Sequence, residues 1–86
     1  MAKIVDADTP AQAVEDAIRT AGGELLRQVE LFDLYQGEPI PPGKKSLAYA
    51  LTFQAEERSL TEDEVLVLYQ RIQQHAAATL GAQPRQ

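Results

Sequence analysis

Four polar side chains beside one proline-rich loop are the residues of this sequence best suited to binding chemistry. Tyr35 ends a strand-like run before the loop, and Lys44, Lys45 and Ser46 follow the loop. An antiparallel hairpin would place Tyr35 beside Ser46. An aromatic ring, a hydroxyl and ammonium groups at the rim can together hold an unstacked base and its phosphate. The same residues also fit an ordinary strand end with an exposed tyrosine.

The two lysines have a structural alternative. Either Lys44 or Lys45 could form an ion pair with Glu38 or Asp33 across the loop instead of contacting a phosphate. The loop is longer than the roughly two to five residues that join most hairpins. Its prolines lower the entropy cost of holding it in one conformation, which suits an ordered rim for a binding face.

The other ionisable residues favour structural roles. The carboxylates of 62–64 occupy the expected first turn of a helix, where they complement the helix dipole. His75 is the only histidine and the chain has no cysteine, so we expect no metal site. Arg58 could tie the preceding loop to the sheet or touch RNA. The sequence contains no catalytic triad, nucleophile elbow or phosphate-binding glycine loop, so we expect no catalytic residues and no cofactor.

Composition limits the class of protein. The 86 residues are enough for one small domain, 1–86, and a chain with 44% hydrophobic and 24% charged residues is typical of a soluble globular protein. A net charge of -5 is opposite in sign to that of most free nucleic-acid binders, so any such contact must come from a local patch. No apolar run approaches the roughly 20 residues that span a bilayer. We therefore expect no membrane partner and a cytoplasmic location.

Periodicity predicts the N-terminal half as a strand, a helix and a strand. A short β-branched run at about 2–5 is the first strand and is short enough to be truncated. Thr9 and Gln12 predict a capping box at the start of a helix that Gly22 ends. The next strand, 25–35, changes its apolar phase midway, which indicates a bulge or a strand buried on both faces.

The C-terminal half predicts a strand, a helix and a last short strand. In 46–54 the large apolar residues alternate with small ones, and Leu34 is expected to pair with Leu47. We assign Phe32 and Leu34 to the face that the helices cover. A capping box at Thr61 starts the second helix. The last strand contains Pro84, which would confine it to an edge.

This order, β-α-β-β-α-β, predicts an α+β fold of the ferredoxin-like split βαβ type. Each helix carries a single apolar stripe, so both helices can cover only one face of a four-stranded antiparallel sheet. The other face stays open. Ser46 and the small residues that alternate with the core residues would form its shallow floor.

Three motifs resemble one known family. They are Phe32-Asp33-Leu34-Tyr35-Gln36-Gly37, Pro42-Gly43-Lys44-Lys45-Ser46-Leu47-Ala48 and Arg58-Ser59-Leu60-Thr61-Glu62-Asp63-Glu64-Val65. Their order and spacing are similar to those of the ferredoxin-fold anticodon-binding domain at the C-terminus of the bacterial phenylalanyl-tRNA synthetase β chain. The similarity extends from about Ala2 to Arg85.

The resemblance implies a site and partners. In the family a tyrosine at the end of the second strand stacks on the first anticodon base, and this residue corresponds to Tyr35. Ser46 corresponds to a hydrogen-bonding partner of that base, and Ala2 to a small residue that lets the base lie flat. The implied partners are the anticodon stem-loop of phenylalanine tRNA, the remainder of the synthetase β chain and the α subunit. Amino-acid activation with ATP would take place elsewhere in that enzyme.

A different class of function is also compatible with the predicted fold. A stand-alone ferredoxin-like protein-interaction or small-molecule-sensing module could dimerise through its open sheet, because edge strands pair readily with a second chain. A mass that depends on concentration, without any response to RNA, would favour this alternative.

Overall fold

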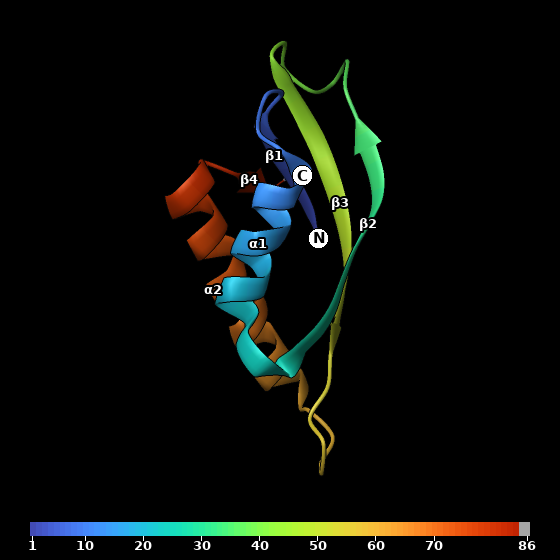
Figure 1. The fold of residues 1–86 in the computed structure, drawn as a ribbon, viewed down its shortest axis with the longest axis vertical. Helices are drawn as coiled ribbons and strands as arrows, with labels where there is room; N and C mark the ends of the chain where they lie inside the picture. Colours follow the sequence, from blue (N-terminus) through green and yellow to red (C-terminus); the bar gives the residue numbers. More distant parts are fainter. Residues whose placement is uncertain (85–86) are drawn as a thin grey trace.

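The computed structural model describes residues 1–84 and has the predicted order of elements (Figure 1). The elements are β1 (Ala2–Asp6), α1 (Ala11–Gly22), a short 3-10 turn η1 (Gly23–Leu25), β2 (Leu26–Tyr35), β3 (Lys44–Phe53), α2 (Glu62–Leu80) and β4 (Gln83–Pro84). The molecule is elongated, with extents of 45 × 21 × 20 Å. The β2–β3 loop lies at one end of the long axis, and the segment that leads into α2 lies at the other.

The four strands form one antiparallel sheet in the order β2-β3-β1-β4, with both helices against one face (Figure 1). This order confirms the ferredoxin-like prediction. The fourth strand forms despite its proline: Pro84 lies opposite Lys3 on the edge strand β4. An edge position tolerates proline, because no further strand needs its missing amide hydrogen. The remainder of the predicted strand, 85–86, lies outside the described residues.

The β2–β3 hairpin has the predicted register. Leu34 lies opposite Leu47, and Tyr35 lies opposite Ser46. The register shifts between Leu31 and Asp33, which confirms the predicted bulge and leaves Phe32 as the extra residue. A second shift, between Leu26 and Gln28, was not predicted.

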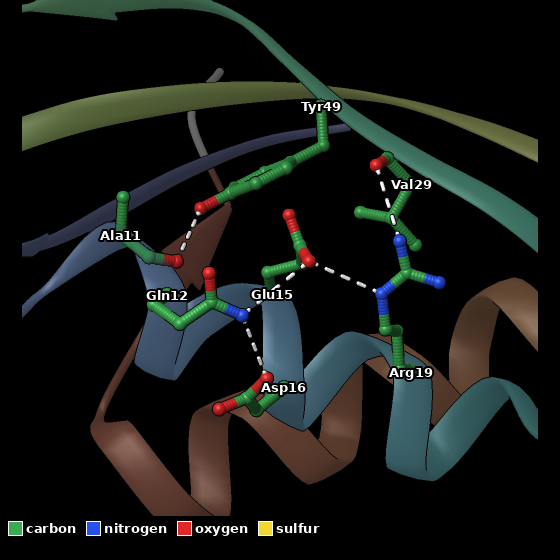
Figure 2. A network of polar contacts seen from close by, with 7 residues as sticks. All are labelled: Ala11, Gln12, Glu15, Asp16, Arg19, Val29 and Tyr49. Atoms are coloured by element: carbon green, nitrogen blue, oxygen red, sulfur yellow. Dashed lines mark hydrogen bonds and ion pairs between the residues drawn. The ribbon is translucent and has the colours of Figure 1, made fainter.

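The core lies between the sheet and the two helices. It combines β3, α1 and α2 through Leu47, Tyr49, Val14, Ile18 and Ile72, all at most 1% exposed. The Tyr49 hydroxyl donates a hydrogen bond of 2.9 Å to the Ala11 carbonyl, which fastens the first turn of α1 to the middle of the sheet (Figure 2). Burial, with a smaller contribution from the Glu15 carboxylate, raises the pKa of Tyr49 to about 12.

A second polar tie joins α1 to the edge of the sheet. The Arg19 guanidinium lies 3.1 Å from the Glu15 carboxylate on its own helix and donates a hydrogen bond of 3.5 Å to the Val29 carbonyl of β2 (Figure 2). Together with the Tyr49 bond, this contact fixes α1 over β2 and β3.

The predicted cap of α2 is confirmed, whereas the predicted cap of α1 is wrong. At α2 the Thr61 side chain accepts the Glu64 amide, and the Glu64 carboxylate accepts the Thr61 amide. At α1 the N-cap is Pro10, and no side chain caps the helix. The Thr9 amide donates instead to the Asp6 carbonyl at 3.0 Å, so Thr9 closes a turn and the helix starts after it. The Gln12 side chain bonds to the carboxylates of Glu15 and Asp16.

The helices cover less of β2 than predicted. Leu34 shares the face of its partner Leu47, yet it is 51% exposed, and Phe32 in the bulge is 65% exposed. The predicted face is therefore correct for Leu34, whereas Phe32 is the extra residue of the bulge; neither is buried, because the helices do not cover the outer half of β2. We call this half of β2, residues 31–35, the uncovered arm.

A buried lysine was not foreseen from the sequence. Lys3 is 1% exposed and lies opposite Leu47, on the face that the helices cover. Its ammonium donates a hydrogen bond of 3.0 Å to the Gln73 side chain of α2. Burial lowers the pKa of Lys3, because leaving water disfavours the charged form.

Candidate nucleic-acid interface

The face of the sheet opposite the helices has a floor of small side chains. Residues that lie opposite one another in a register share a face, and that face alternates along each strand. Ala2 lies opposite Ala48, and Ser46 lies between Ile4 on β1 and Tyr35 on β2. The structure therefore brings three of the predicted site residues, Ala2, Ser46 and Tyr35, onto this open face.

The bulge decides on which face Tyr35 lies. Val29 and Leu31 lie opposite Leu51 and Tyr49, on the helix side of the sheet. Without the extra residue in the bulge, continued alternation would turn Tyr35 to that side as well. The register shift reverses the alternation, so Tyr35 lies opposite Ser46 on the open face.

The Tyr35 side chain is both accessible and anchored. It is 40% exposed, and its hydroxyl donates a hydrogen bond of 2.5 Å to the Glu38 carbonyl. This bond ties the far end of the ring to the loop, so the ring orientation is fixed before any ligand arrives. A fixed ring with an exposed side is suited to stacking, because little conformational freedom is lost when a base binds.

Ser46 is less accessible than a shallow floor would suggest. It is 2% exposed, because Tyr35 and Ile4 flank it in the register. Ala48, the next residue on the same face towards the middle of β3, is half-buried and so is more accessible than Ser46.

The loop 36–43 is an ordered rim. The Ile40 amide donates to the Gly37 carbonyl at 2.8 Å, and the Ala7 amide of the neighbouring turn donates to the Gly43 carbonyl at 2.8 Å. Ile40 is 4% exposed, so the loop has an apolar anchor of its own. The Glu38–Pro39 peptide is cis. The Glu38 carbonyl that receives the Tyr35 hydroxyl thus belongs to a loop that is anchored by Ile40 and by backbone hydrogen bonds.

The two predicted lysines lie on different faces. Lys44 shares the parity of Ser46 and lies opposite Asp6, with which it forms an ion pair. The structural alternative of an ion pair is therefore correct for Lys44, although the partner is Asp6 instead of Glu38 or Asp33. Lys45 lies opposite Val5, so its strand position belongs to the helix side. It is half-buried there, at the end of the sheet.

The remaining candidates have structural surroundings. The Arg58 guanidinium forms two contacts of 2.7 Å with the Glu64 carboxylate, so it ties the 54–61 loop to the start of α2 and not to the sheet. His75 is half-buried on α2. Over residues 1–84, no group of three or more His, Asp or Glu side chains is arranged to hold a metal ion. Within the same range, neither helix has the length and apolarity needed to cross a membrane.

Sequence comparisons give this geometry a family context. The profile of the ferredoxin-fold anticodon-binding domain matches residues 1–85. The phenylalanine–tRNA ligase β subunit of Moorella thermoacetica is 52% identical over 86 residues, which are 100% of this chain and 11% of that protein. Those of Symbiobacterium thermophilum and Corynebacterium jeikeium are each 46% identical over 99% of this chain, and the match covers 9% and 10% of their lengths. The chain thus spans about a tenth of the curated relatives it matches. These relatives do not favour the stand-alone module.

Proposed function

Because the chain belongs to the ferredoxin-fold anticodon-binding domain family, we propose that it binds the anticodon stem-loop of phenylalanine tRNA as a non-catalytic domain of a phenylalanine–tRNA ligase β subunit. The observation that carries this proposal is the exposed ring of Tyr35 on the face that no helix covers, opposite Ser46. A base-sized flat surface on a sheet is a common platform for unstacked bases.

In the proposed complex the first anticodon base stacks on Tyr35. Ala2 and Ala48 lie opposite each other and leave room for the base to lie flat. Ser46 would bond the base edge after a small shift of its neighbours, since it is 2% exposed. Lys44 would replace part of its ion pair with Asp6 by a contact to an RNA phosphate. Lys45 lies on the helix side, so its side chain would have to pass around the end of the sheet to reach the RNA backbone.

The negative charge of the chain indicates that the domain binds tRNA together with other parts of the enzyme. The net charge of -5, together with Glu30 and Asp33 on the open face, gives little electrostatic attraction for RNA. In the proposed enzyme, the rest of the β subunit and the α subunit hold the tRNA and raise the effective concentration of its anticodon loop. The ATP-dependent chemistry belongs to those parts, so we propose no cofactor for this domain. Translation enzymes of this kind act in the cytoplasm, which is the location we propose.

The experiment is an amide chemical-shift titration of the chain at low salt. The cognate ligand is the phenylalanine-tRNA anticodon stem-loop, and the control is a stem-loop of equal charge with a different loop sequence. We expect shifts centred on Tyr35, Ser46 and the 36–43 rim that are larger with the cognate loop. The proposal is wrong for the isolated chain if both RNAs give the same diffuse shifts or none.

A further inference from the structure

The beginning of α2 displays large apolar side chains that the fold does not use. Leu68, Ile72 and Ala76 form the buried stripe of this helix. Leu66 and Val67 lie outside this stripe and are 53% and 62% exposed. A helix that needs only one apolar stripe to pack on its sheet normally carries polar residues at such positions. We call the ridge of Leu66 and Val67, with the hollows on both sides of it, the α2 ridge.

Two hollows flank the exposed side chains, so this surface has the relief of a ridge between two grooves. The first has a volume of about 510 Å³ and is lined on its apolar side by Leu60, Val65, Leu66 and Tyr69. The second has a volume of about 340 Å³ and is lined by Leu25, Val67 and Leu68, together with Asp63 and Glu64. A ridge between two grooves is the relief into which the side-chain rows of another helix pack.

Unpaired negative charges line the α2 ridge. Glu62 and Asp63 line the first hollow and have no ion-pair or hydrogen-bonding side-chain partner among residues 1–84. Two arginines lie near the ridge in the chain: Arg58 is held by the Glu64 carboxylate, and Arg71, one helical turn after Val67, donates a hydrogen bond of 2.8 Å to the Ala21 carbonyl. An RNA would be repelled by such a rim, and a second copy of this chain would bring like charges together. A positively charged polypeptide is the complementary partner.

We propose that the α2 ridge docks a basic amphipathic helix supplied by another polypeptide segment. Apolar side chains of that helix would fill the two hollows, and its lysines or arginines would meet Glu62 and Asp63. The α2 ridge lies at the opposite end of the long axis from the 36–43 rim (Figure 1). Docking there leaves the open face and Tyr35 accessible, so this contact is compatible with RNA binding and does not depend on it.

The test uses the chain as it is and a synthetic peptide as the probe. The peptide, of about 18 leucine and lysine residues, is long enough to form a helix with one apolar and one basic face. A second peptide of the same composition has its residues reordered so that no apolar face forms, and a third replaces lysine by glutamate. In an amide chemical-shift titration, the first peptide is expected to shift residues 60–69 and Leu25. The reordered and acidic peptides are expected to bind about tenfold more weakly or not at all.

Two double variants locate the contact. Leu66→Ser with Val67→Ser is expected to weaken binding of the basic peptide by about tenfold or more, because two central apolar anchors are lost. Leu31→Ser with Leu34→Ser, a matched change at another exposed apolar pair, is expected to leave it unchanged. Circular dichroism checks that both variants fold.

Charge is tested separately. Glu62→Gln with Asp63→Asn is expected to weaken binding and to reduce its salt dependence. The proposal is overturned if the first peptide binds the Leu66→Ser, Val67→Ser variant with the same affinity as the parent chain. It is equally overturned if the peptide shifts the amide signals of every acidic surface to the same extent. It is also overturned if sedimentation shows that the α2 ridge instead joins two copies of this chain.

Discussion

Tyr35 supplies the stacking surface of the proposed site, so it is the side chain whose removal matters most for RNA. Tyr35→Ala is expected to weaken binding of the cognate stem-loop by about 1–3 kcal/mol, the range for losing one base–aromatic stack. The fold should persist, because the residue is 40% exposed at the end of the uncovered arm. Fluorescence anisotropy with labelled stem-loop measures the affinity.

The control is Tyr35→Phe, which keeps the ring and removes the hydroxyl that bonds to the Glu38 carbonyl. It is expected to retain most of the affinity. Equal affinities of the alanine variant and the parent chain would remove Tyr35 from the site.

Lys3 is predicted to make stability depend on alkaline pH. Its folded-state pKa is lowered from 10.5 by burial, so between the lowered value and 10.5 the unfolded chain binds more protons. The free energy of unfolding contributed by this residue therefore rises with pH across that window. Lys3→Met is expected to raise stability at pH 7 and to remove this rise.

Urea unfolding of both chains at pH 7 and near pH 10 checks this prediction. Tyr49→Phe is the control, because the raised pKa of Tyr49, about 12 against 10.0, works in the opposite direction. Identical pH dependence in the Lys3→Met variant and the parent chain would contradict the assignment.

The sequence predicts the hairpin that carries the candidate site, but it does not predict that the Lys3 side chain points into the core. The hairpin register follows from matching Leu34 with Leu47, because a slip by one residue would turn all the apolar residues of β3 outward. In β1 the pattern is too short to decide. A polar Lys3 between Ala2 and Ile4 suggests that Lys3 points outward, but Lys3 and Val5 are the buried pair. The burial depends on the amide of Gln73 on a distant helix, which no local pattern contains.

At the scale of elements, the passage from α1 to β2 depends on the absence of a side chain at Gly22. A Cβ atom there would lie 2.5 Å from Leu26 Cδ2 and 2.7 Å from its Cβ. Gly22→Ala is expected to destabilise the fold by about 1–3 kcal/mol through overpacking. Helix propensity alone would change stability in the opposite direction by about 1 kcal/mol. Thermal unfolding followed by circular dichroism decides the sign, and a stabilised variant would contradict the packing argument.

The start of α2 is predicted to contribute to acid sensitivity. The hydrogen bond from Arg58 and the backbone bond from Thr61 lower the pKa of Glu64 from 4.5 to about 2. The stabilisation is therefore complete above about pH 4.5 and is lost as the pH falls towards 2. Glu64→Gln should show a shallower loss of stability over this range, measured by urea unfolding at several pH values. The same slope in variant and parent would show that the pair contributes nothing.

The capping boxes show how far local sequence rules reach. Both helices have a threonine three residues before a glutamine or glutamate, yet only Thr61 is used as a cap. Thr9 is taken by the turn that follows β1, where its amide bonds to Asp6. The competing bond partner, Asp6, lies outside the four-residue motif, so the motif alone does not distinguish the two cases.

At the scale of the whole molecule, the helices cover β1, β3 and the first half of β2, and they leave the uncovered arm of the edge strand β2 exposed. The number of layers could be predicted from the single stripes of the helices, but not how far each helix reaches along β2. Hydrogen exchange should show this division: amides of β2 from 31 to 35 are expected to exchange faster than those from 26 to 30. Equal protection along the strand, measured by NMR, would contradict it.

The bulge at Phe32 has a consequence for how such a domain can change in evolution. Because side chains alternate along a strand, inserting or deleting one residue between Leu31 and Tyr35 would turn the tyrosine to the helix side while the loop and the fold persisted. Length changes of two residues would restore its direction. If the tyrosine stacks on a base as proposed, natural length variation in this part of the strand is expected in even steps wherever the stack is kept. Single-residue gaps would then identify relatives without this contact.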